Sequence, residues 1–387
     1  MMLGYLLARA GVGVVVLEKH ADFLRDFRGD TIHPSTLEVM HELGLLEDFL
    51  KRPHQEVRQL GGQVGGEFAM MADFSHLPTK CKFIAFMPQW DFLDFLAERA
   101  KCYPTFHLKM EAEAVDLLEA EGRVVGVRAN IPDGQLDIHA DLVVGADGRH
   151  SVVRDKAELE IKSFGAPMDV LWFRISRQPS DDEQTLGRIT NGKMMVMLNR
   201  GDYWQCAYLI RKGDLDRIKR SGLEAFHNDV ASVAPFLRDR INELSDWDQI
   251  KLLTVLVDRL RKWYRPGLLC IGDAAHAMSP IGGVGINLAI QDAVAAANIL
   301  APRLSRGTVS IADLERVQLR RELPTRLTQL GQVFIQDRLI SRILGGSEQI
   351  AMPWPLKLLQ RWPFLRRIPA RLIGIGFRPE HVKQVSL

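Results

Sequence analysis

The sequence has few cysteines and no long apolar run, and both shortages exclude classes of protein. Its four cysteines (Cys81, Cys102, Cys206 and Cys270) form no CxxC pair and do not cluster with histidines, so they indicate neither a zinc site nor a disulfide framework. No apolar run reaches the roughly 18 residues that span a bilayer, and the N-terminus lacks the charged-then-apolar layout of an export signal. The sequence therefore predicts a soluble, unexported protein of the reducing cytoplasm.

Charge of either sign is also not in excess. The chain has 50 basic and 48 acidic residues, which leaves a net charge of +2 over 387 residues. So weak a field does not indicate a nucleic-acid partner. Apolar residues make up 47% and charged residues 25% of the chain, as in an average globular protein. The length allows two domains and a core large enough to enclose a cofactor.

The N-terminal residues lack the first strand and the glycine-rich turn that open a dinucleotide-binding βαβ unit. Residues 1–11 (MMLGYLLARAG) have helical apolar spacing, and residues 12–17 (VGVVVL) form an apolar run that is typical of a buried parallel strand. The run ends at Glu18, where such a unit places an acid that binds a ribose, about 20 residues after its GxGxxG turn. Counting back from Glu18 passes Met1, so we expect either a truncated reading of a longer protein or a lost strand.

Two later stretches combine a short apolar strand with a turn that contains an aspartate. They are residues 141–149 (DLVVGADGR) and residues 268–276 (LLCIGDAAH). Each places an Asp at the carboxyl end of a strand, where open α/β sheets bind ligands. Glycines in residues 282–285 then precede a strong helical pattern, and their backbone N–H groups lie at the positive end of that helix. This predicts a site for an anion or a developing negative charge.

The middle of the chain has a different periodicity. Residues 170–176, 194–200 and 203–211 are strand-like and are separated by polar loops. This pattern predicts an antiparallel sheet.

Four features together resemble one enzyme family. They are Glu18 after its apolar run, Arg28-Gly29-Asp30, residues 145–149 (GADGR) and residues 272–287 (GDAAHAMSPIGGVGIN). They resemble the flavoprotein aromatic hydroxylases, the FAD-dependent monooxygenases of the para-hydroxybenzoate hydroxylase fold. The resemblance covers roughly residues 1–330 and lacks the first strand with its GxGxxG turn.

The resemblance implies an α/β fold with a discontinuous cofactor domain. A three-layer, Rossmann-like FAD-binding domain, with a parallel sheet that lacks its first strand, would comprise residues 1–165 and 255–335. An antiparallel β-sheet substrate domain would be inserted at 166–254, with 53–84 as a candidate contribution. Residues 336–387 would form a basic, aromatic and helical C-terminal segment.

The resemblance also implies residues that hold the cofactors. Glu18 would bind the adenosine ribose, Arg28 the FAD pyrophosphate, and Gln89 would lie along the ribityl chain. Asp147, Gly148 and Arg149 would contact FAD and also NADH or NADPH. Gly272 and Asp273 would bind the ribityl or pyrophosphate part of FAD. The residues around the flavin ring would be Pro280, Gly282, Gly283, Gly285 and Asn287. Backbone donors from Gly283 to Asn287 would stabilise the anionic reduced flavin.

In the resembling family the antiparallel sheet forms the far wall of the substrate pocket. The candidates to line it are Trp172, Met195, Met197, Trp204 and Tyr208. Alternation alone does not distinguish a pocket wall from core packing, so the alternative is that these residues are core. No metal site and no catalytic side chain are expected, because the flavin carries the chemistry.

The implied activity is hydroxylation of an aromatic or polyketide-like molecule with O2 and NADH or NADPH, through a flavin hydroperoxide. One alternative is a flavin-dependent reductase of isoprenoid double bonds, which would not consume oxygen. Another is a non-catalytic remnant that binds FAD poorly because the N-terminal turn is missing. Residues 352–378 are basic and aromatic without an acid, so they either contact an anionic membrane surface or another subunit, or pack back onto the domain.

Overall fold

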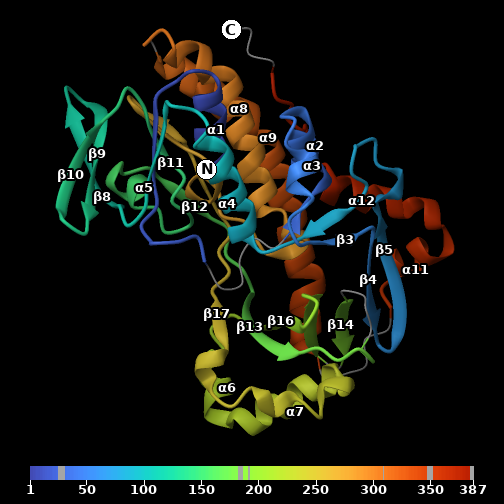
Figure 1. Ribbon diagram of the computed structural model, residues 1–387. Coiled ribbons are helices and arrows are strands. Elements are labelled where there is room, and N and C mark those ends of the chain that lie inside the picture. Colours follow the sequence, from blue (N-terminus) through green and yellow to red (C-terminus); the bar gives the residue numbers. More distant parts are fainter. Residues whose placement is uncertain (25–30, 182–185, 191, 308, 347–351, 384–387) are drawn as a thin grey trace.

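The computed structural model describes residues 1–24, 31–181, 186–190, 192–307, 309–346 and 352–383 (Figure 1). The parallel strands that carry the predicted motifs form two separate pieces. In the first, β1 (Val14–Leu17) pairs in parallel with β7 (Phe106–Lys109). In the second, β11 (Val143–Gly145) pairs in parallel with β20 (Leu268–Cys270), and β19 (Tyr264–Arg265) joins β20 in the antiparallel direction. Both pieces are built from the apolar runs that precede Glu18, Asp147 and Asp273.

Four long or buried helices pack beside these strands. They are α1 (Met2–Arg9), α4 (Gln89–Ala100), α8 (Gly285–Leu304) and α9 (Ile311–Ile335). α8 contacts both α1 and α9, which run along it in Figure 1. The segment Ile281–Leu304 is long and apolar enough to cross a membrane, but 67% of that window is buried inside the protein, as expected for a core helix.

A large second sheet lies next to the parallel pieces. It has seven strands in the order β17 (Lys251–Leu253), β13 (Met168–Ser176), β16 (Tyr203–Arg211), β15 (Lys193–Asn199), β14 (Leu186–Thr190), β4 (Gln59–Val64) and β5 (Glu67–Asp73). All neighbours in it are antiparallel except β14 and β4. Residues from 59–73 and from 168–253 therefore share one sheet, although they are far apart in sequence.

Helices cover one face of the seven-stranded sheet. α6 (Leu215–Ser221) and α7 (Leu223–Val233) lie at that end of the molecule in Figure 1, and Phe226 of α7 packs edge-on against Phe173 and Tyr208 of the sheet. The opposite face borders the cavity described below.

The C-terminal residues are helical and pack back onto the chain. The π-helical turn η7 (Gln336–Ile340) continues α9 into α10 (Ser341–Gly345), and α11 (Trp354–Arg361), η8 (Pro363–Arg366) and α12 (Arg367–Gly374) follow. The side-chain amide of Gln360 donates to the carbonyl of Met70 on β5 at 2.8 Å and accepts from its N–H at 3.2 Å. One side of the segment therefore rests on the protein, as one of the two sequence alternatives predicts.

Smaller elements complete the chain. The remaining helices and strands are α2 (Pro34–Glu42), α3 (Leu46–Phe49), α5 (Val152–Lys156), the sheet of β2 (Thr31–Ile32), β6 (Ile84–Phe86) and β3 (Gln55–Val57), the sheet of β10 (Gly134–His139), β9 (Arg123–Ile131) and β8 (Glu113–Ala120), the pair of β12 (Ile161–Ser163) and β18 (Asp258–Leu260), and the short turns η1 (Phe74–His76), η2 (Pro235–Leu237), η3 (Ile241–Glu243), η4 (Trp247–Gln249), η5 (Gly272–Ala274) and η6 (Ile281–Gly283).

Candidate cofactor and substrate site

A cavity of about 2640 Å³ lies between the parallel strands, the seven-stranded sheet and the C-terminal helices. Pockets for a single small ligand usually measure about 300–1,000 Å³. This cavity therefore has room for a large cofactor and a second molecule side by side.

Most residues that the sequence predicts to hold FAD line this one cavity. They are Glu18, Gln89, Asp147, Gly148, Arg149, Gly272, Asp273, Pro280, Gly282, Gly283 and Gly285. They come from the carboxyl ends of β1, β11 and β20, the first turn of α4 and the loop before α8. Because carboxyl ends of parallel strands meet at one edge of a sheet, motifs that are far apart in sequence converge here.

Two predicted residues do not join this lining. Arg28 lies outside the described residues. The side chain of Asn287 is buried away from the cavity: its Oδ1 accepts from the N–H of His33 at 2.9 Å and from the hydroxyl of Thr36 at 2.7 Å. Its Nδ2 donates to the carbonyl of Thr31 at 3.1 Å. The prediction that this side chain lines the flavin ring is wrong, because the first turn of α8 points it at residues 31–36, and it fixes that segment to α8.

The glycine loop before α8 has a backbone conformation that residues other than glycine rarely adopt. Gly282 and Gly283 have φ values of 77° and 62°, and a Cβ on Gly283 would lie 2.4 Å from Oγ1 of Thr31. No side chain caps the N-terminus of α8. Gly285 and Ile286, the first residues of α8, line the cavity, so the positive end of the helix dipole borders it and favours a negative charge there.

The two aspartate turns are linked by Arg149. Asp147 accepts from the hydroxyl of Ser151 at 2.5 Å and from the N–H of Val153 at 3.2 Å, so its carboxylate holds the start of α5. Arg149 donates to the carbonyl of Thr254 at 3.1 Å, and its guanidinium lies 4.0 Å from the carboxylate of Asp273. This arrangement places a guanidinium between the two motif turns at the cavity wall.

A buried polar network that the sequence analysis missed supports the Gly272 turn. Asp292 accepts from the N–H of Gly272 at 3.1 Å, pairs with His276 at 2.6 Å and accepts from Arg321 at 2.9 Å. Burial alone would raise the pKa of Asp292, but His276 and Arg321 lower it. The carboxylate therefore stays ionised and anchors the turn. The sequence signal for this network was Asp292 itself, a charged residue inside a largely apolar helical run.

Glutamines on one face of α9 hold the loop that precedes the glycines. Gln332 accepts from the N–H of Ser279 at 3.1 Å and donates to the carbonyls of Ser279 and Ile281 at 3.0 and 2.9 Å. Gln329 donates to the carbonyl of Ala277 at 3.1 Å, and Gln336 donates to the hydroxyl of Ser279 at 2.7 Å. The sequence analysis missed these residues too, although their spacing of three and four matches a helix.

The sheet face that borders the cavity is the one that the sequence analysis did not choose. Trp172 lines the cavity. Met195, Met197, Trp204 and Tyr208 are buried on the other face, in the core shared with α7. Their neighbours line the cavity instead, namely Val170, Met194, Val196, Leu198, Ala207 and Leu209. The prediction for those four residues is wrong because successive side chains of a strand point to opposite faces, and both faces are apolar here.

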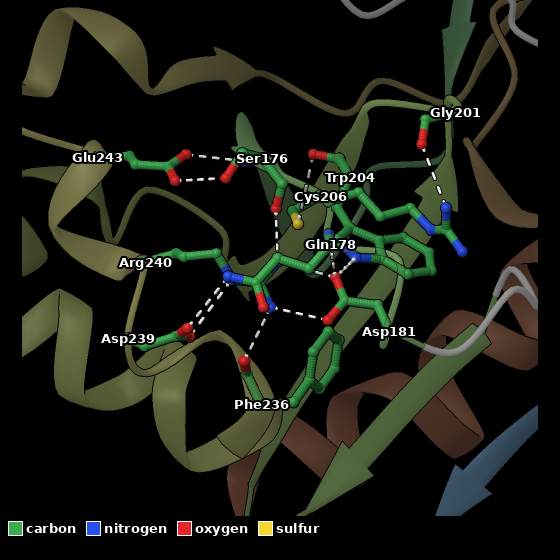
Figure 2. A network of polar contacts seen from close by, with 11 residues as sticks. Ser176, Gln178, Asp181, Gly201, Trp204, Cys206, Phe236, Asp239, Arg240 and Glu243 are labelled. Carbon is green, nitrogen blue, oxygen red and sulfur yellow. Dashed lines mark hydrogen bonds and ion pairs between the residues drawn. The ribbon is translucent and has the colours of Figure 1, made fainter.

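Polar contacts anchor Trp204 on that far face (Figure 2). Its indole N–H donates to Asp181 at 2.9 Å, and Arg240 donates to both carboxylate oxygens of Asp181 at 2.8 Å. Burial opposes ionisation of Asp181, but the hydrogen bonds from Arg240, the N–H of Gln178 and Trp204, together with the charge of Arg240, outweigh it and lower the pKa to about 2. Trp204 is thus part of a structural network.

Candidate metal ligands do not cluster in the part of the chain that the structure describes. No group of three or more His, Cys, Asp or Glu side chains is placed there to hold a metal ion.

Comparison with known proteins places the chain among flavoproteins. The family model described as FAD binding domain matches residues 1–324. The chain is 30% identical over 374 residues to 6-methylpretetramide 4-monooxygenase of Streptomyces rimosus, which covers 96% of this chain and 88% of that protein. It is 29% identical over 302 residues to rifampicin monooxygenase of Streptomyces venezuelae, which covers 76% of this chain and 60% of that protein.

Solved structures share the fold. PqsL of P. aeruginosa in complex with 2-aminobenzoylacetate matches with a TM-score of 0.74 at 23% identity, over 89% of this chain and 95% of that chain. OxyS anhydrotetracycline hydroxylase of Streptomyces rimosus matches with a TM-score of 0.73 at 23% identity, over 96% of this chain and 73% of that chain. The predicted mixed α/β fold with a helical C-terminus is confirmed. The chain therefore belongs to the FAD-binding-domain family of flavoprotein monooxygenases and is an FAD-dependent oxidoreductase.

Proposed function

We propose that this enzyme hydroxylates an aromatic or polyketide-like molecule with O2 and a reduced nicotinamide cofactor. The observation that carries the proposal is the convergence of three strand-end motifs and the glycine loop on one cavity of about 2640 Å³, the rest of which is walled by an apolar sheet face. The names of the relatives, which act on 6-methylpretetramide and rifampicin, support a large ring-containing substrate.

The two parallel pieces of sheet are proposed to belong to one Rossmann-like sheet. β1 pairs with β7, β11 pairs with β20, and residues of β1 and β11 line the same cavity. Parallel strands whose carboxyl ends line one cavity are typical of a single doubly wound sheet.

The donor set on the cavity wall fits FAD. Glu18 is an acceptor at the end of β1, where the ribose of a dinucleotide binds. The uncapped N–H groups at the start of α8 suit the part of the flavin that becomes anionic on reduction. Bound FAD supplies the redox chemistry, taking a hydride from NADH or NADPH and then activating O2.

The chain's own residues would position the substrate and exclude water. The apolar side chains of Val170, Trp172, Val196 and Leu209 form one wall opposite the glycine loop. Such a wall removes water from around reactive oxygen species and holds an apolar ring against the flavin side of the cavity.

The first test measures cofactor retention. The purified chain is mixed with FAD and gel-filtered, and the visible absorption spectrum is recorded. We expect retained flavin at close to one per chain, and a colourless chain would contradict the proposal. Asp273→Ala should lower retention, because Asp273 lines the cavity, whereas Asp133→Ala, in an exposed turn, should not.

The second test separates hydroxylation from reduction. NADH and NADPH oxidation are followed together with O2 uptake while aromatic candidates are added. Substrate-stimulated O2 uptake supports the monooxygenase. Nicotinamide oxidation that needs substrate but no O2 would instead support a reductase.

A further inference from the structure

The last helix of the chain turns two of its large apolar residues outward, while Ile373 packs inward on a buried cluster. In α12, the small residues Ala370 and Gly374 face the protein, and a Cβ on Gly374 would lie 2.8 Å from Cδ1 of Leu77. Ile368 and Leu372, four residues apart on the outer face, remain 58% and 44% exposed. A helix that only packs on its own domain would place its large apolar residues inward.

The neighbouring elements show the same inversion. Trp354 on α11 is 75% exposed, Phe364 on η8 is 62% exposed, and Trp362 between them is also exposed. Figure 1 shows α11 and α12 beyond β5, at the edge of the molecule, and both contact β5. We name Trp354, Trp362, Phe364, Ile368 and Leu372 the outer apolar face. Several large exposed apolar residues in one segment mark a contact surface.

The charges of the segment that carries the outer apolar face have one sign. Residues 352–378 contain Lys357, Arg361, Arg366, Arg367, Arg371 and Arg378 and no acidic residue. The side chains of Lys357, Arg361 and Arg371 form no ion pair with any residue that the structure describes, and all three are exposed. A surface that combines exposed aromatic residues with unpaired cations complements an anionic, apolar partner.

An opening of the cavity lies beside this face. Trp354 on α11 and Phe334 on α9 both line the cavity, yet Trp354 is three-quarters exposed and Phe334 is 65% exposed, so they mark its mouth. Arg338 and Arg342, one and two turns beyond Phe334, also line it and are exposed. The rim of the mouth is therefore apolar and basic, like the outer apolar face next to it.

We propose that α11, η8 and α12 lie on an anionic phospholipid surface, with the mouth of the cavity directed at the membrane. The outer apolar face would enter the headgroup region while the cations pair with acidic lipid headgroups. An apolar substrate would then reach the cavity from the bilayer without crossing water. This contact is peripheral, and it does not depend on the FAD-based reaction proposed above.

The test is co-sedimentation of the full chain, loaded with FAD, with lipid vesicles. Vesicles of phosphatidylcholine alone are compared with vesicles that also contain phosphatidylglycerol, at low and high salt. We expect binding only to the phosphatidylglycerol vesicles, and less of it at high salt. Equal binding to both lipids, or none to either, would overturn the proposal.

Two matched charge variants sharpen the test. K357Q/R361Q/R371Q should weaken vesicle binding about a hundredfold, since each cation near an anionic surface contributes about 1 kcal/mol. K109Q/R238Q/K251Q removes the same charge at exposed positions elsewhere and should leave binding unchanged. If both variants lost vesicle binding equally, binding would depend on the net charge of the protein and not on this surface, and the proposal would be overturned.

Two further measurements distinguish a membrane contact from a contact between two copies of the chain and from the proposed reaction. F364S/I368S should also lose vesicle binding while retaining FAD, which shows that the variant is folded. If this variant instead converts a dimer of the parent chain into a monomer, the outer apolar face is a contact between copies and the membrane proposal fails. If the parent chain did not bind FAD, the proposed reaction would be contradicted, but the proposed membrane contact would not, because vesicle binding is measured separately.

Discussion

The guanidinium of Arg321 on α9 donates to the carboxylate of Asp292 on α8 at 2.9 Å, and neither side chain reaches solvent. The same carboxylate accepts from the N–H of Gly272, just after β20, the strand that precedes the glycine loop. A long-range ion pair inside the helical layer thus supports a turn at the cavity wall. A buried pair of this kind is costly to break, because removing one partner leaves an uncompensated charge in the core.

Arg321→Met should therefore strongly destabilise the protein. The expected loss is about 3–5 kcal/mol in the free energy of unfolding, because the buried carboxylate of Asp292 then loses the guanidinium that compensates its charge. Urea unfolding followed by circular dichroism measures the loss. The control is Arg326→Met on the same helix, whose pair with Glu322 is 59% exposed on the arginine side and 28% exposed on the glutamate side and should cost about 1 kcal/mol or less. Equal losses of unfolding free energy in the two variants would show that the buried ion pair stabilises the protein no more than the exposed one.

Gly283→Ala should damage the glycine loop before α8. The new Cβ would meet Oγ1 of Thr31 at 2.4 Å, and the φ of 62° disfavours any L residue by about 1–2 kcal/mol. We expect a lower unfolding temperature and weaker FAD retention after gel filtration. The matched control is Gly331→Ala on α9, where no atom lies within 4 Å and alanine favours the helix by about 1 kcal/mol. Full FAD retention by Gly283→Ala would contradict the position assigned to this loop.

Stability should fall as the pH drops from about 6.5 to about 4, because of His33. This imidazole is fully buried, and burial lowers its pKa from 6.5 to about 4, although its bond to the carbonyl of Ile373 opposes the shift. In that pH range the unfolded chain binds a proton at His33 that the folded chain does not, so acid favours unfolding. The shift corresponds to about 3 kcal/mol across the window.

Urea unfolding at several pH values checks this contribution. His33→Gln removes the titrating group and should flatten the dependence between pH 6.5 and 4. His107→Gln, at an exposed position on β7, should keep the slope of the parent chain. An unchanged slope in His33→Gln would assign the acid sensitivity to other groups.

The predicted cofactor residues come together in one cavity because the sequence signals of their motifs are local. Each consists of an apolar strand, a tight turn and an aspartate or glycines, and the ends of parallel strands necessarily meet at one edge. The anchors of those turns were missed, since Asp292 pairs with Arg321 29 residues later and Gln332 reaches Ser279 from 53 residues away. Contacts of that length depend on how α8 and α9 pack, which no short pattern encodes.

The wall of the substrate side was misjudged for a different reason. Alternation in β15 defines two sets of side chains, and a polar set would normally identify the solvent face. Here both sets are apolar, because one faces α7 and the other faces the cavity. The sequence alone therefore does not show whether Met194 or Met195 faces the cavity, because neither set of side chains is polar.

These two adjacent methionines supply a direct test of that assignment. Met195 is fully buried in the core under α7, so Met195→Ala should leave a cavity and cost about 2–5 kcal/mol in unfolding free energy. Met194 borders open space already, so Met194→Ala removes few packing contacts and should cost less than about 1 kcal/mol. Urea unfolding of the two variants makes the comparison with the same substitution on the same strand. Equal losses would mean that the Met194 face is packed as tightly as the core, and the apolar wall could not then be a substrate surface.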